Sequence, residues 1–77
     1  MSKKETILEI LKNINPSVNF EQVQGILENG YIDSMDFMRF IAELGQHFGV
    51  DIDADEITSE NFDTVETIEK MIERLKG

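Results

Sequence analysis

The chain has 77 residues and no cysteine, which predicts one small domain (1–77) without a disulfide or a thiolate metal site. Sixteen acidic against seven basic residues give a formal net charge of −9, which argues against a nucleic-acid partner because phosphates require Lys and Arg. The charge favours docking to basic partner surfaces, although a merely solvated acidic exterior explains it equally well. Charged and apolar residues alternate from the start, so we expect no signal peptide, no membrane span and a cytoplasmic location.

Apolar residues at helical spacing predict a first helix over 3–14. Pro16 ends it, because proline disfavours the helical conformation of the preceding Asn15. The following segment, 15–32, carries apolar anchors without a sustained period and closes on the turn signal Asn29-Gly30. Irregular segments of this length are unusual in so small a domain and are often functional.

A second helix is predicted over 34–48, with Asp33 as its N-cap and Gly49 just past its end. Asp36 suits the positive end of the helix dipole. The predicted buried face has residues every three to four positions, widened by Phe37 and Phe40: Met35, Met38, Ile41, Leu44 and Phe48. The two methionines could instead line an apolar groove for varied ligands, a common use of this flexible side chain.

The remainder predicts an acidic linker, a short third helix over 56–61 and a last helix over 64–76. Asp63-x-x-Glu66 resembles a capping box at the start of that last helix. Three longer helices and one short one, each apolar on one side, predict an all-α fold, a small four-helix bundle.

Ser34 is the candidate reactive residue of the chain. An Asp-Ser pair before a helix is usually only a cap, but here a long anchored loop leads to it. A catalytic serine needs a base within hydrogen-bond reach. His47, the single histidine, lies 13 residues further along the same predicted helix, which is about 20 Å. Ser34 is therefore not self-activated, and His47 itself is more simply a surface residue near the helix end.

Alternating acids at Asp51, Asp53 and Asp55 resemble the first half of a calcium loop. The second half fails, because Glu56 replaces the required glycine and Phe62 the bidentate glutamate. We therefore predict no dedicated metal site, while weak binding of divalent cations by these carboxylates stays open.

The stretch Gly30-Tyr31-Ile32-Asp33-Ser34-Met35-Asp36 resembles the phosphopantetheine attachment signature of acyl carrier proteins, whose usual core is Asp-Ser-Leu. The resemblance extends over most of the chain, since the first helix, the long loop, the Asp-Ser helix start, Phe48-Gly49-Val50 and the Thr64-Val65 helix fall in family order. It implies a four-helix fold of acyl-carrier type and no catalysis by the chain itself.

The resemblance also implies a cofactor and partners. A phosphopantetheinyl transferase would move 4′-phosphopantetheine from coenzyme A onto Ser34, with Asp33 supporting the modification. An acyl- or aminoacyl-loading ligase would attach acyl groups to the cofactor's thiol as thioesters. The carrier would then deliver them to synthases or transferases with basic docking patches. Met35, Asp36 and Glu43 on the second helix are the expected partner contacts, and we expect a monomer.

The pathway is less settled than the family. Fatty-acid, lipid or polyketide synthesis is the first expectation. Arg39 and Gly45-Gln46, however, replace acids that are usual in fatty-acid carriers, and Phe37 is bulkier than the common small residue. These departures leave open a dedicated carrier, for D-alanine or another amino acid or for a polyketide or specialised lipid pathway. The separate alternative is a helical interaction module without the cofactor.

Overall fold

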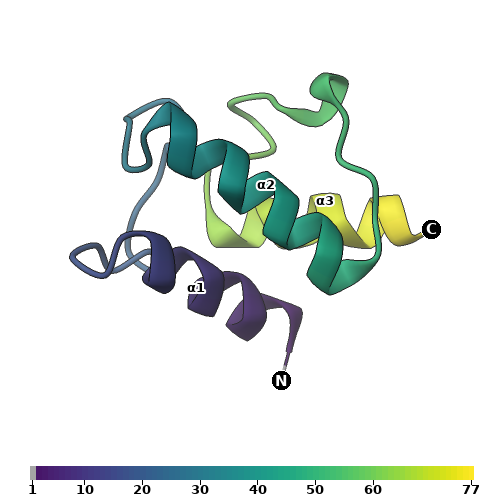
Figure 1. Ribbon diagram of the computed structural model, residues 1–77, viewed down its shortest axis with the longest axis horizontal. Helices are drawn as coiled ribbons and strands as arrows, with labels where there is room; N and C mark the ends of the chain where they lie inside the picture. Colours follow the sequence, from purple (N-terminus) through teal and green to yellow (C-terminus); the bar gives the residue numbers. More distant parts are fainter. Residues whose placement is uncertain (1) are drawn as a thin grey trace.

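The computed structural model describes residues 2–77, and these contain α-helices and one 3-10 helix but no strand. The α-helices are α1 (Lys3–Ile14), α2 (Ser34–Phe48) and α3 (Val65–Lys76), and the 3-10 helix is η1 (Ala54–Glu56). α1 packs against both α2 and α3, and a long loop leads from the end of α1 to the start of α2 (Figure 1). No helix within residues 2–77 has the length and apolar character needed to cross a membrane.

The first helix begins and ends as its sequence predicts. The Ser2 side chain accepts the Glu5 N–H, and the Glu5 carboxylate accepts the Ser2 N–H, which completes a capping box. Asn15 ends the helix, and its N–H donates to the carbonyl of Leu11. Lys4 reaches Glu66 on α3 at 2.8 Å, an exposed contact that links the first and last helices.

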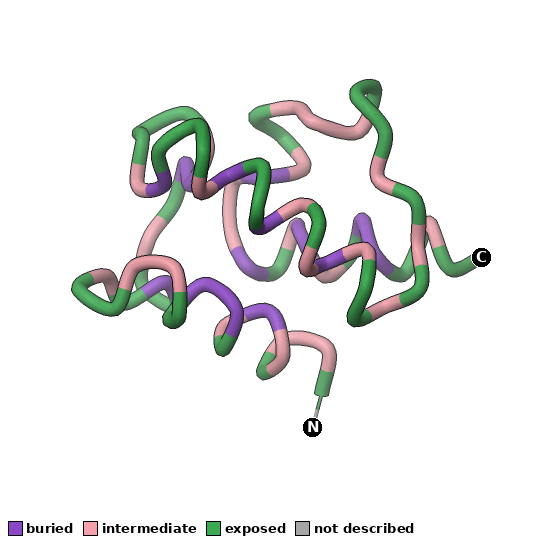
Figure 2. The backbone as a smooth tube through the Cα atoms, viewed as in Figure 1, coloured by how far each residue is buried: buried purple, intermediate pink, exposed green. Residues whose placement is uncertain are grey.

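One apolar core joins the three α-helices to both loops, and Figure 2 shows the buried stretches of the helices turned toward one another. It contains a cluster of three aromatic rings, Phe37, Phe40 and Phe62. Phe62 packs edge-on against both others, with ring centroids 5.1 Å from Phe37 and 6.3 Å from Phe40. Because Phe62 comes from the segment before α3, this cluster fixes α2 against the C-terminal part of the chain.

The predicted buried face of α2 is wrong at its first turn. Met35 and Met38 are 84% and 65% exposed, whereas Phe37, Phe40 and Leu44 are buried. The helix carries more apolar side chains than one face can hold, and burying the phenylalanine rings removes more apolar surface from water than burying the methionines. α2 is therefore rotated so that the rings meet Phe62, with Ile41 and Phe48 half-buried at the edge.

The predicted helix over 56–61 is also wrong. The 3-10 helix ends at Glu56, and the Asn61 side-chain amide donates to the Glu56 carbonyl at 2.8 Å. Such a side-chain bond competes with the backbone bonds that would extend a helix. The all-helical fold is confirmed, but the predicted count of four helices is not, since the fourth element is this short 3-10 turn.

The capping box predicted from Asp63 and Glu66 is wrong as well. Thr64 is the N-cap of α3: its hydroxyl accepts the Thr67 N–H at 3.2 Å, and the Thr67 hydroxyl accepts the Thr64 N–H at 3.0 Å. The Asp63 carboxylate turns instead to the loop before α2, where it accepts the Gly25 N–H at 2.7 Å. Its role is therefore long-range and does not lie in α3.

Arg74 on α3 holds Glu56 through two hydrogen bonds, of 2.7 and 3.3 Å. These bonds lower the pKa of Glu56 below its ordinary value, aided by the charge of Arg74 and a hydrogen bond from Asn61. A carboxylate with a lowered pKa stabilises the fold above its unfolded-state pKa of about 4.3, and this stabilisation is lost as the pH falls through the folded-state pKa.

Arg74→Ala is accordingly expected to lower Tm at pH 7, by ~1–3 °C, and the difference from wild type should shrink toward zero as the pH falls below about 4.3. Thermal melts followed by circular dichroism at stepped pH values measure this. Lys70→Ala is the matched control, because Lys70 is exposed on the same helix and makes no ion pair within residues 2–77. A difference for Arg74→Ala that stays constant down to pH values well below the range of carboxylate titration would contradict the prediction.

Candidate functional site

Ser34 is the first residue of α2, and its side chain is exposed. The N-cap is Asp33, whose Oδ1 accepts the Asp36 N–H at 2.8 Å. Within residues 2–77 the Ser34 hydroxyl makes no hydrogen bond. The capping work of the Asp-Ser pair is therefore done by the aspartate, and the serine hydroxyl is available for reaction.

The start of α2 also fits a phosphate ester on Ser34. The N–H groups of Ser34 and Met35 have no acceptor within the described residues, while those of Asp36 and Phe37 bond to Asp33. Unpaired N–H groups at a helix N-terminus favour an anion. The neighbouring carboxylates of Asp33 and Asp36 oppose a phosphate electrostatically, so the helix terminus supplies the local compensation.

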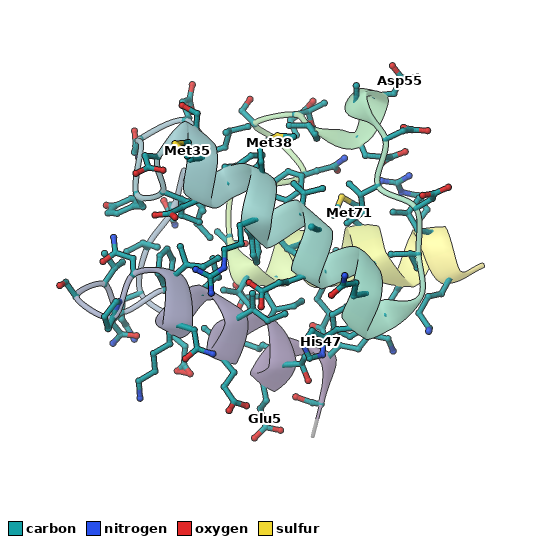
Figure 3. All side chains as sticks on the ribbon, viewed as in Figure 1. Glu5, Met35, Met38, His47, Asp55 and Met71 are labelled. Carbon is teal, nitrogen blue, oxygen red and sulfur yellow. The ribbon has the colours of Figure 1, made fainter. Side chains whose placement is uncertain are left out.

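His47 lies at the other end of the helix. Figure 3 shows it at the end of α2 opposite Met35, and it is exposed. It borders a hollow of about 260 Å³ between α1 and α2, together with Glu43 and residues of α1. The structure therefore agrees with the sequence that His47 cannot act as a base for Ser34.

Met35 and Met38 form the exposed apolar pair of α2, one turn apart and directly after Ser34 (Figure 3). Met71, in contrast, is buried in the core. Large apolar side chains that lie exposed beside one another are candidates for a surface that a partner covers. Of the two interpretations of the methionines left open by the sequence, an accessible apolar surface agrees with their exposure and core packing does not.

The charged candidates on α2 differ in availability. Asp36 is half-buried beside Asp33, and Glu43 lies two turns further on. Arg39 Nε is 3.3 Å from Glu43 Oε2, but that oxygen is buried and accepts no hydrogen bond within residues 2–77, so the contact is an ion pair without a directed bond. Arg39 therefore offsets part of the negative charge on this helix.

The alternating acids Asp51, Asp53 and Asp55 are exposed on the loop around η1. Nowhere in residues 2–77 do three or more His, Cys, Asp or Glu side chains gather closely enough to hold a metal ion. Glu56, which follows them, is engaged by Arg74.

The described residues form a small helical fold with an exposed serine at a helix N-terminus, beside an exposed apolar pair, which fits the resemblance to acyl carrier proteins. Comparison with protein families agrees, because the model of the phosphopantetheine attachment site matches residues 4–75. The chain belongs to this family. It is a carrier domain for covalently attached 4′-phosphopantetheine and not itself a catalyst.

Among curated proteins, the chain is similar to the D-alanyl carrier protein of Lactobacillus acidophilus. The two are 29% identical over 78 residues, which cover 100% of this chain and 99% of that protein. The predicted family and cofactor are thus confirmed.

Proposed function

We propose that Ser34 bears the 4′-phosphopantetheine, and that residues 1–77 act as a single carrier domain. The observation that carries this proposal is the division of labour at the start of α2, where Asp33 caps the helix and leaves the exposed Ser34 hydroxyl unengaged. Asp33 supports modification by holding the first turn of α2 in helical form around the serine.

In the transfer, Ser34 Oγ forms a bond to the phosphorus of the phosphopantetheine phosphate of coenzyme A. The bond from that phosphorus to the 3′,5′-ADP portion breaks, and the serine proton passes to a base of the transferase, since His47 is about 20 Å away. The attached phosphopantetheine supplies the thiol that carries the cargo as a thioester. This chain has no cysteine of its own.

We further propose that the cargo is an activated amino acid of the D-alanine class, in preference to a fatty-acyl or polyketide chain. The similarity to a D-alanyl carrier protein extends over the full chain. Arg39 supports the same cargo, because its ion pair with Glu43 makes α2 less acidic. Partner enzymes that recognise a uniformly acidic helix would find less negative charge on this one.

The packing of the core supports a small cargo. Phe37 and Phe40 lie within 6.3 Å of Phe62 and fill the space between α2 and the segment before α3. A long hydrocarbon chain entering the core near Ser34 would have to displace these close-packed rings, which costs stability. An aminoacyl group can remain outside the core and makes no such demand.

The partners that follow are a phosphopantetheinyl transferase and an aminoacyl-loading ligase with basic docking surfaces. Met35 and Asp36 are the proposed contacts beside Ser34, and Glu43 contributes less because Arg39 partly neutralises it. The monomeric state and cytoplasmic location stay predictions from the sequence.

Incubation with coenzyme A and a broad-specificity phosphopantetheinyl transferase tests the attachment. We expect intact mass spectrometry to show the gain of one phosphopantetheinyl group and peptide fragmentation to locate it on Ser34. A gain on another residue would overturn Ser34 as the attachment residue. No gain in the folded chain would overturn the attachment itself and favour a cofactor-free interaction module.

The cargo is tested on the loaded carrier. With ATP, D-alanine and a D-alanine–carrier ligase, we expect a thioester that hydroxylamine removes, and we expect much slower loading with a medium-chain fatty acid and an acyl–carrier ligase. Efficient fatty-acyl loading with no D-alanyl thioester would reject the amino-acid cargo while leaving Ser34 as the attachment residue.

A further inference from the structure

The loop before Ser34 is fastened to the segment before α3. The Gly25 N–H donates to Asp63 Oδ1 at 2.7 Å, and the Ile26 N–H donates to the Asp63 carbonyl at 3.0 Å. The Leu27 N–H donates to the Phe62 carbonyl at 3.1 Å. We call these three bonds the clasp. They join residues that are more than thirty positions apart in the sequence, so the clasp exists only in the folded chain.

A second attachment holds the other end of the same loop. Asn15, at the end of α1, donates from its side-chain amide to the Tyr31 carbonyl at 3.0 Å. Tyr31 precedes the N-cap Asp33 by two residues, and its ring packs edge-on against Phe20 at 6.5 Å. The backbone leading directly to Ser34 is thus bound to α1.

The loop from Gly25 to Ile32 is also held by contacts of its own. The Asn29 N–H donates to the Gly25 carbonyl at 2.7 Å, and Ile26 and Ile32 are buried. Gly25 has φ +65°, and a Cβ there would meet the Asn29 amide at 2.5 Å, so the tight turn requires glycine. The clasp, the turn and the hydrogen bond from Asn15 together fix the backbone that leads to Ser34.

The Asp63 carboxylate has no part in starting α3, which Thr64 and Thr67 cap between them. Asp63→Ala therefore removes one bond of the clasp and leaves the helix cap intact. This separation allows the role of the clasp to be measured apart from the folding of α3.

We infer that Asp63 and Asn15 are positioning residues for the transfer of 4′-phosphopantetheine onto Ser34. The inference rests on the proposed attachment at Ser34. Neither residue touches Ser34; both act through the loop. A transferase needs the serine oxygen in line with the phosphorus, and a loop that samples other conformations offers that geometry for a smaller fraction of the time.

The test is transfer kinetics on the full chain, with a broad-specificity transferase, saturating coenzyme A and varied carrier concentration. Loss of one hydrogen bond predicts that Asp63→Ala and Asn15→Asp each raise KM for the carrier about 3- to 10-fold, with kcat nearly unchanged. Asp63→Asn keeps an acceptor oxygen at the same place and should stay close to wild type. Amide hydrogen exchange at residues 25–27, whose N–H groups donate the clasp bonds, should be faster in Asp63→Ala and unchanged in Asp63→Asn.

Thr64→Ala is the matched control, because it destabilises the start of α3 next to Asp63 and leaves the clasp bonds in place. An equal rise of KM in Thr64→Ala and Asp63→Ala would reduce the effect to lost stability and overturn the inference. An unchanged KM or unchanged amide exchange in Asp63→Ala would also overturn the positioning role. Modification of wild type at Ser34 would then still support the proposed function. Failure of wild type to accept the group at Ser34 would instead reject the proposed function, and the positioning role with it.

Discussion

Ser34→Ala is expected to abolish attachment of 4′-phosphopantetheine and to leave Tm within about 2 °C of wild type. The side chain is exposed and bonds to nothing within residues 2–77, so its loss removes chemistry without removing a structural contact. Alanine is also a good residue for a first helical turn. Intact mass after incubation with coenzyme A and transferase measures the first effect, and circular-dichroism melts measure the second.

Two variants of Asp33 complete this experiment. Asp33→Ala removes the acceptor for the Asp36 N–H and should destabilise the chain by about 1 kcal/mol, or roughly 4–8 °C in Tm. Asp33→Asn keeps a good cap and should keep Tm. Slow modification of Asp33→Asn would show that the transferase uses the negative charge of Asp33, whereas a full rate would assign its role to the cap alone. Modification of Ser34→Ala at the wild-type level would contradict the attachment residue itself.

Features of the structure that depend on residues close together in the sequence could be predicted from the sequence. The bounds of α1 and α2 agree with the prediction at both ends, because local signals set them: Pro16 after α1, Asp33 before α2 and Gly49 after it. Gly49 has φ +64°, the left-handed conformation in which glycine commonly ends a helix. Ser34 and its cap belong to the same local pattern, so the centre of the candidate site could also be predicted.

Features that depend on distant residues could not be predicted. The period of α2 allows either the methionines or the phenylalanines to face inward, and the choice is made by Phe62, which lies more than twenty residues further along. The sequence predicts a capping role for Asp63 because Asp before a helix usually is a cap, but its partner Gly25 lies in a loop without periodicity. Asn15 gave only a helix-end signal, and nothing local indicates its bond to Tyr31.

The rotation of α2 leads to the second large effect. Replacing Met35 and Met38 together by glutamine is expected to lower kcat/KM for the transferase about 10- to 100-fold, mainly through KM. Both side chains are exposed beside Ser34, so an enzyme that reaches the serine must cover them. Glutamine has a similar length and no charge, but its polar amide cannot replace the apolar contact of methionine with the transferase. Tm should change little, because neither side chain packs in the core.

The double replacement by leucine is the matched control, since it keeps apolar surface of similar volume and should stay within a few-fold of wild type. Salt separates the apolar contact from charge. The defect of the glutamine variant should persist when ionic strength is raised, whereas any defect of Asp36→Asn should fade, because salt screens the attraction between charges on two approaching surfaces. Wild-type kinetics in the glutamine variant would mean that partners approach Ser34 from another side, and a defect that disappears with salt would assign recognition to charge instead of to the methionine pair.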